Sequence, residues 1–145
     1  ARPAPGGVEL GVVALHVLPQ PALELAPVAL GEALVQCVSH VMNRRPAQLM
    51  QLGISGQDDP LDALPIARRL VELVDSGSGV LILTDILGAT PANTAAKLLE
   101  PGRIEGVTGV NVPMLLRVIT YRERSIEVLV KKAVAGACEG VVHMK

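Results

Sequence analysis

The chain has 145 residues, of which 50% are hydrophobic, and a formal net charge of -1. This length predicts one domain with a core of its own. Tyrosine occurs once and phenylalanine and tryptophan are absent, so the sequence offers neither aromatic stacking platforms nor a basic surface for nucleic acid. The apolar runs are too short for a membrane span, and no secretory signal is visible. We therefore expect a cytoplasmic protein that is not membrane-embedded and binds no nucleic acid.

The N-terminal residues contain prolines and a glycine pair. We expect residues 1–7 to be a flexible leader and residues 8–145 to form the single domain. Residues 8–15 are mostly apolar and predict a central strand that ends at His16. Three prolines interrupt residues 17–27, which predicts a partly buried loop between this strand and the first helix.

Two helices and a short strand are expected next. Apolar residues at helical spacing predict a helix over residues 30–42, whose buried stripe comprises Leu30, Ala33, Leu34, Cys37, Val38 and Val41. Residues 48–54 alternate weakly and predict a second strand. The acidic segment Asp58-Asp-Pro60 starts a helix that runs to Asp75, with an apolar stripe of Leu64, Ile66, Leu70, Val71 and Val74. Pro65 should confine the regular part of this helix to its C-terminal side, or mark the first turn.

A polar segment follows the third predicted strand. Residues 80–84 are almost wholly apolar, which is typical of a strand buried on both faces of a parallel sheet. Asp85 then lies where this strand leaves the core. Gly88 permits a tight turn, Thr90 can cap a helix, and Pro91 suits the first helical position. We therefore expect the Asp85 carboxylate and the Thr90 hydroxyl to lie beside the positively polarised start of a helix.

The last third of the chain predicts one strand and three helices. They are the helix over residues 91–99, the strand over 104–108, the helix over 114–121, and a final helix that Ser125 caps. In residues 109–113 we expect Gly109 and Asn111 to adopt unusual backbone angles. The buried stripe of the final helix is expected to be Ile126, Leu129, Ala133, Ala137 and Val141. Residues 140–145 can add an edge strand, also to a partner subunit.

This alternation of apolar strands and helices predicts a doubly wound, mainly parallel α/β sheet. In such sheets ligands bind at the carboxyl ends of the strands, near the switch in strand order. His16 and Asp85 both fall at strand ends of this kind. We therefore expect them at one site.

Several familiar sites are absent from the sequence. It contains no nucleotide-binding glycine loop and no G-x-S-x-G nucleophile elbow. Cys37 and His40 lie three residues apart but have no further ligands at zinc spacing. Cys37 and Cys138 give no disulfide framework. We expect no metal, and we expect Cys37 and His40 to be packing residues.

The pairing of His16 with Asp85 suits a phosphoryl acceptor. A neutral imidazole, with an ordinary pKa of about 6.5, is a competent nucleophile near neutral pH. A carboxylate that accepts one ring N–H leaves the other ring nitrogen free to attack, and it stabilises the cationic ring afterwards. The helix start behind Thr90 offers amides to the phosphoryl oxygens. The alternative is that a histidine at a strand end has only a structural role.

Two sequence boxes resemble the mannose-family enzyme IIA component of the bacterial phosphotransferase system. The pattern T-D-x-x-G-[GA]-[ST]-P is present at residues 84–91, and G-V-N-x-P-M-L is present at residues 109–115. Tyr121-Arg122 also fits the pattern. The resemblance covers residues 29–142.

The resemblance implies a flavodoxin-like domain, with helices on both faces of the sheet, that forms a homodimer, in some members by exchange of a C-terminal strand. It implies a histidine that takes a phosphoryl group from the phosphocarrier protein HPr and passes it to a IIB component, with no cofactor. Carried over to this sequence, Asp85 orients the histidine. Thr90, with Gly88 and Ala89, belongs to the phosphate loop. His16 is the candidate phosphorylation site.

The position of the histidine leaves alternatives open. The family pattern places it a few residues before Leu30-Gly-Glu-Ala-Leu34, where an ungapped count finds Pro27. His16 serves only if residues 17–27 form an insertion. A phosphorelay transferase, acting in sugar transport or as a regulatory signal, is the leading hypothesis. The alternatives are a regulatory interaction module that has lost phosphotransfer and the phosphoryl donor subunit of dihydroxyacetone kinase.

Overall fold

The computed structural model describes residues 9–12, 30–47, 49–53, 60–87 and 90–145. In chain order its elements are β1 (Glu9–Val12), α1 (Leu30–Met42), β2 (Leu49–Gln51), α2 (Pro60–Val74), β3 (Val80–Leu83), α3 (Thr90–Ala96), β4 (Ile104–Val107), α4 (Val112–Thr120) and α5 (Ile126–Glu139). The strand and helix order matches the sequence prediction. The expected leader over residues 1–7 and the loop over residues 17–27 lie outside the described residues.

The four described strands form one parallel sheet in the order β2-β1-β3-β4. The chain steps from β1 to β2 in one direction and then returns to β3 on the other side of β1. The strand order therefore switches between β1 and β3, as in flavodoxin-like folds. This arrangement confirms the predicted doubly wound, parallel fold.

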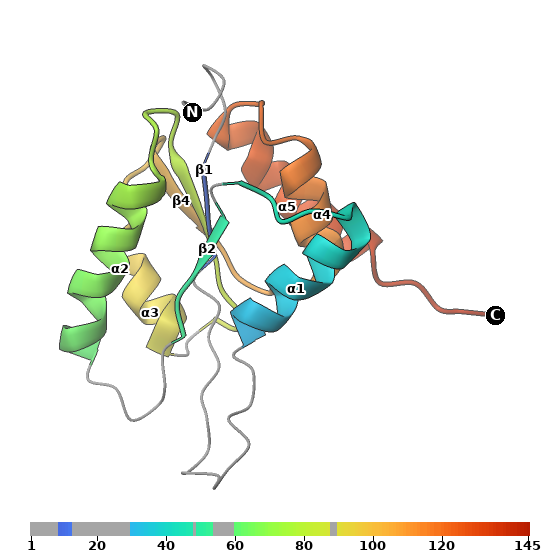
Figure 1. The fold of residues 1–145 in the computed structure, drawn as a ribbon, viewed down its shortest axis with the longest axis horizontal. Helices are drawn as coiled ribbons and strands as arrows, with labels where there is room; N and C mark the ends of the chain where they lie inside the picture. Colours follow the sequence, from blue (N-terminus) through green and yellow to red (C-terminus); the bar gives the residue numbers. More distant parts are fainter. Residues whose placement is uncertain (1–8, 13–29, 48, 54–59, 88–89) are drawn as a thin grey trace, which may run out of the picture.

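Helices cover both faces of the sheet (Figure 1). On one face α1, α4 and α5 enclose an apolar core that includes Leu81, Leu83 and Leu115. On the other face α2 and α3 pack over Val80 and Ile82. Val80 to Leu83 are fully buried, because successive strand side chains point to opposite faces and both faces are covered.

Helix α2 begins at Pro60, where the acidic start signal predicts it, and Pro65 lies inside it. The expectation that Pro65 would confine the helix is wrong. Its missing N–H removes one backbone hydrogen bond, but the residue is exposed and the buried face runs past it through Ala63, Ala67, Val71 and Val74. This packing holds the helix through the proline. Ile66, predicted to be buried, is 54% exposed.

Helices α1 and α5 bury part of the predicted stripes, together with residues outside them. In α1 the buried residues are Gly31, Leu34, Val35 and Val38, whereas Cys37 and Val41 are exposed. Cys37 and His40 are thus not core packing residues, since His40 is exposed as well. In α5 the buried residues are Ile126, Leu129, Ala133 and Gly136. Val141 lies beyond the helix and is exposed.

The remaining differences concern element ends. Ser125 caps α5 as predicted, and Gly109 has the expected positive φ of 82°. Asn111 instead has ordinary extended angles and acts as the N-cap of α4. Helix α3 ends at Ala96, because the next turn tightens into Lys97 N–H and Leu98 N–H bonds to carbonyls three residues back. Residues 141–145 form no strand within the described chain.

Candidate functional site

The carboxyl edge of the sheet brings the ends of β1 and β3 together. Val12, the last residue of β1, pairs with Leu83, the last residue of β3. Asp85 follows Leu83 by two residues, and His16 follows Val12 by four. The strand that precedes His16 in the sequence and the strand that precedes Asp85 thus end side by side.

Hydrogen bonds to the end of β4 and to the residues that follow it hold the backbone at Thr84 and Asp85. Thr84 N–H donates to the Val107 carbonyl at 3.0 Å, and Val110 N–H donates to the Thr84 carbonyl at 3.0 Å. Gly109 N–H donates to the Asp85 carbonyl at 2.8 Å. The left-handed backbone of Gly109 makes this turn possible at little cost. Asp85 therefore stands on a rigid support.

The Asp85 side chain is half-buried at this edge. Its Oδ1 accepts a hydrogen bond from the Ile86 amide at 2.7 Å. A carboxylate held in this way has lost part of its rotational freedom, which favours orientation of an imidazole ring. The predicted partner, His16, lies outside the described residues.

The other predicted site residues are described only in part. Gly88 and Ala89 lie outside the described residues. Thr90 begins helix α3, in agreement with the predicted helix start. Its side chain is not among the described parts of the chain. Of the predicted site, the structure therefore places Asp85, the backbone start of α3 and the exit of β1.

Two buried polar atoms mark the same edge and were missed by the sequence analysis. Within the described part of the chain, Gln51 Oε1 and Thr84 Oγ1 are the buried side-chain polar atoms that have no hydrogen-bond partner. Gln51 ends β2, and Thr84 follows the end of β3. The signal in the sequence was a polar residue at the end of one short apolar strand and directly after the other. An unsatisfied buried polar group needs a physical explanation, and a role in catalysis is one such explanation.

Large apolar side chains are exposed beside Asp85. Ile86 is 62% exposed and Leu87 is 80% exposed. Two adjacent exposed aliphatic side chains on the turn after β3 have no role in the core. They are suited to contact with another protein.

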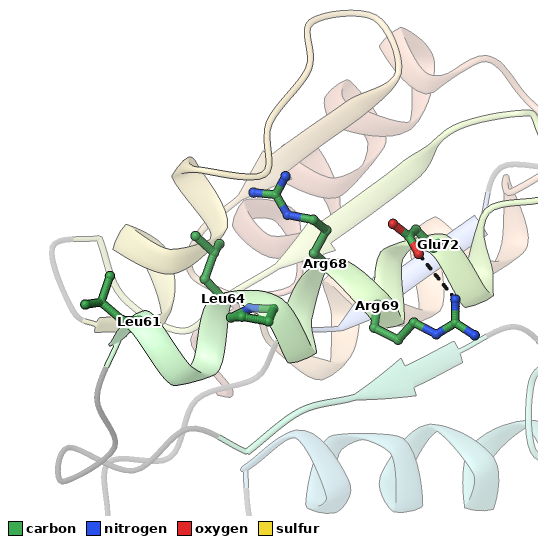
Figure 2. Close-up of a pocket in the computed structure, with 6 residues that line it drawn as sticks. Leu61, Leu64, Arg68, Arg69 and Glu72 are labelled. Atoms are coloured by element: carbon green, nitrogen blue, oxygen red, sulfur yellow. Dashed lines mark hydrogen bonds and ion pairs between the residues drawn. The ribbon is translucent and has the colours of Figure 1, made fainter.

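A shallow hollow of about 420 Å³ lies along the outer face of α2 and is not the predicted site (Figure 2). Its lining comes entirely from α2, including Leu61, Leu64 and Arg68. Arg69 forms a surface ion pair with Glu72 at 3.3 Å. These side chains do not converge on a common point, so the hollow lacks the polar geometry of a catalytic site.

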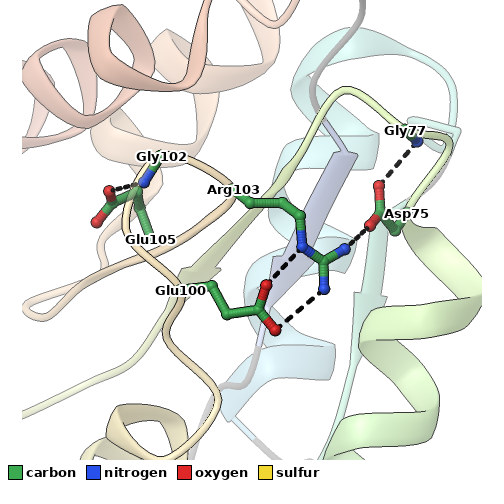
Figure 3. Close-up of polar contacts among 6 residues, drawn as sticks. All are labelled: Asp75, Gly77, Glu100, Gly102, Arg103 and Glu105. Carbon is green, nitrogen blue, oxygen red and sulfur yellow. Dashed lines mark hydrogen bonds and ion pairs between the residues drawn. The ribbon is translucent and has the colours of Figure 1, made fainter.

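A cluster of charges lies at the opposite, amino end of β3 and β4 (Figure 3). The Arg103 guanidinium binds Asp75 Oδ2 at 2.6 Å and Glu100 Oε2 at 2.7 Å. The hydrogen bond from Arg103 lowers the pKa of the Glu100 carboxyl, and Glu100 in turn raises the pKa of Arg103. Asp75 also accepts from the Gly77 amide at 2.8 Å. Each charge is paired, which indicates a structural cluster.

The described residues include neither a group suited to a metal ion nor a helix suited to a membrane. Across the described ranges no three histidine, cysteine or acidic side chains are grouped so that they could hold a metal ion. None of the helices described combines the length and apolar character that a membrane crossing requires.

Comparison with known proteins gives one family. A family model described as EIIA-man, the fructose IIA component of the PTS system, matches residues 28–134. His16 precedes the matched residues. The mannose-specific EIIAB component of Escherichia coli K12 is 36% identical over 75 residues, which are 50% of this chain and 23% of that protein. The fructose-specific EIIA component of Bacillus subtilis is 49% identical over 45 residues, or 30% of this chain and 31% of that protein.

Solved structures are similar over nearly the whole chain. The mannose/sorbose-specific IIA subunit from Enterococcus faecalis has a TM-score of 0.77 at 14% identity, with 96% of each chain covered. Component EIIA from Streptococcus agalactiae has a TM-score of 0.75 at 19% identity, with 94% of this chain and 96% of that chain covered. At these identities the likeness establishes the fold.

Proposed function

Since the chain belongs to the EIIA-man family of the phosphotransferase system, we propose that it accepts a phosphoryl group from phosphorylated HPr on His16. It then passes the group to a IIB component or uses it as a regulatory signal. The pairing of Val12 with Leu83 carries this proposal. That pairing ends the strands that precede His16 and Asp85 at the same edge of the sheet.

The proposed transfer requires a nucleophile and a loop that binds the phosphoryl oxygens. Asp85 accepts one ring N–H of His16, so the other ring nitrogen attacks the phosphorus of the donor. A phosphorus–nitrogen bond forms as the bond to the donor histidine breaks. The ring then carries positive charge, which the Asp85 carboxylate stabilises. No metal or other cofactor enters this step.

The phosphoryl oxygens are received at the start of α3. We assign this role to the backbone amides of Gly88 and Ala89 and to the Thr90 hydroxyl. The positive end of a helix adds about 0.3–1 kcal/mol to the binding of an anion.

The docking partner is a protein that presents its phosphohistidine at the carboxyl edge. The exposed side chains of Ile86 and Leu87 stand directly after Asp85. Burial of these two side chains against the partner removes apolar surface from water, which favours association. This feature supports a protein donor rather than a small phosphorylated molecule.

A second function is favoured by one specific observation. The family model begins at residue 28, after His16, and Pro27 occupies the ungapped position of the histidine. A regulatory interaction module without phosphotransfer would keep the same fold and the same exposed edge. It would not take up phosphate.

One labelling experiment separates the two functions. The protein is incubated with phosphoenolpyruvate, enzyme I and HPr, and intact mass is measured before and after acid treatment. We expect one acid-labile, base-stable phosphoryl group on wild type, none on His16→Ala, and much slower labelling of Asp85→Ala. His40→Ala and His143→Ala are matched controls, since both histidines are exposed, and should label normally.

Two outcomes contradict the proposal in different ways. An unlabelled wild type excludes phosphotransfer and leaves the regulatory function. Normal labelling of His16→Ala retains phosphotransfer but assigns it to another histidine.

A further inference from the structure

Thr84 has a buried hydroxyl that has no partner among the described residues. The residue is 2% exposed. Two other hydroxyls behave differently, because Ser39 and Thr120 donate to carbonyls four residues back in their helices, at 2.6 and 2.7 Å. Thr84 follows a strand and has no such carbonyl. An unsatisfied hydroxyl in the core is unfavourable, so its retention needs a reason.

The position of Thr84 limits which groups it can bind. Its backbone N–H already donates to the Val107 carbonyl, and its carbonyl already accepts from the Val110 N–H. By alternation along the strand its side chain lies on the face of Val80 and Ile82, the face that α2 and α3 cover. Helix α3, the next element after Asp85, packs on this face, and Ile86 is the first residue after Asp85 in the sequence.

The amide of Ile86 is the nearest candidate in sequence. It now donates to Asp85 Oδ1 at 2.7 Å. A threonine hydroxyl commonly accepts from the amide two residues further on, which for Thr84 is the Ile86 amide. Thr84 and Asp85 are therefore alternative acceptors for one N–H group.

We propose that Thr84 is a positioning residue for phosphoryl transfer. Before transfer Asp85 accepts the ring N–H through Oδ2 and keeps the Ile86 amide on Oδ1. Once the ring is cationic, Oδ1 turns to it as well and Thr84 accepts the Ile86 amide. This inference rests on the proposed function. The exchange leaves the Ile86 amide bonded, gives the Thr84 oxygen a donor, and releases Asp85 Oδ1 for the cationic ring. The Ile86 amide makes one hydrogen bond before and after, so the turn of the carboxylate costs little.

The test uses an isosteric pair of variants in the full chain. Transfer from phosphorylated HPr is measured over a range of HPr concentrations for wild type, Thr84→Val and Thr84→Ser. Because valine lacks the acceptor, we expect kcat to fall about tenfold with KM within about twofold, the effect of one hydrogen bond. Serine keeps the acceptor and should restore kcat.

Two measurements exclude a general loss of structure. The melting temperature of Thr84→Val should be no lower than that of wild type, since the variant removes an unsatisfied polar group. Hydrogen exchange at the Ile86 amide, followed by NMR, should be slow in unphosphorylated wild type and Thr84→Val alike. After phosphorylation it should stay slow only in wild type and Thr84→Ser.

The outcomes separate this inference from the proposed function. If wild type is labelled but Thr84→Val keeps a normal kcat, or if Thr84→Ser is as slow as Thr84→Val, the inference is overturned and phosphotransfer stands. Rapid exchange at Ile86 in phosphorylated wild type also overturns it. An unlabelled wild type overturns both.

Discussion

Asn111 joins two helices through a single side chain. Its Oδ1 accepts the Met114 amide at 2.8 Å and so caps α4, while its Nδ2 donates to the Ala137 carbonyl in α5 at 3.3 Å. The sequence predicted an unusual backbone angle for Asn111. The residue instead stabilises the fold through the hydrogen bonds of its side-chain amide. The same loop contains Gly109, which bonds the Asp85 carbonyl. The cap therefore also stabilises the support of the candidate site.

Replacement of Asn111 by alanine should lower the free energy of unfolding by about 1–2 kcal/mol, because it removes an N-cap and a bond between helices. Asn111→Asp is the matched control, since it keeps the capping acceptor and loses only the donor to Ala137. Urea denaturation should place it between alanine and wild type. An alanine variant as stable as wild type would contradict the capping role.

The elements are tied together differently at the two ends of the sheet. At the amino end Arg103 links the residue after α2 to the turn before β4, through Asp75 and Glu100. Gly79 approaches closely there, since an added Cβ would lie 2.8 Å from the Arg103 carbonyl oxygen. At the carboxyl end polar atoms remain unsatisfied at Gln51 and Thr84. Within the described residues, paired charges hold the amino end of the sheet, whereas the carboxyl end leaves two buried polar atoms without partners.

The Arg103 cluster predicts a pH-dependent stability. The hydrogen bond from Arg103 lowers the folded-state pKa of Glu100 below its unfolded value. The stabilisation is therefore present above the unfolded pKa and is lost as the pH falls through the folded pKa. Arg103→Gln should melt below wild type at pH 7, and the difference should shrink at about pH 3.

Arg69→Gln is the control for this comparison. Arg69 pairs with Glu72 on one exposed helix face, with side chains 70% and 60% exposed. Such surface pairs contribute little, so its melting temperature should match that of wild type at both pH values. A difference for Arg103→Gln that grows as the pH falls would contradict the assignment.

At the scale of the whole molecule, the described chain leaves an apolar C-terminal segment uncovered. Val141, Val142 and Met144 are 78%, 74% and 88% exposed. They follow α5 and contact none of the core clusters. This surface fits the homodimer that the sequence resemblance implies, and a partner subunit would bury it.

Light scattering tests the dimer directly. At micromolar concentration we expect a mass of twice 15.1 kDa. Removal of residues 141–145 should shift the protein towards the monomer, because less apolar surface is buried on association. Val41→Ser, at an exposed position of α1, is the control and should stay dimeric. A monomeric wild type would contradict the expectation.

The sequence by itself determined the order and type of the elements and the identity of the two boxes. The run Val80 to Leu83 is apolar throughout, and only a strand covered on both faces needs that pattern. Residues 30–42 formed the predicted helix with its predicted bounds. The fold class followed from the alternation of strands and helices.

Only the tertiary structure decided which surfaces are buried and which atoms meet. Helix α1 has apolar residues on several sides, so its pattern alone did not favour Val35 over Cys37 or Val41. Pro65 stays helical because packing outweighs one lost hydrogen bond. The pairing of Val12 with Leu83, and the hydroxyl left unsatisfied at Thr84, depend on contacts between distant segments, which local periodicity does not encode.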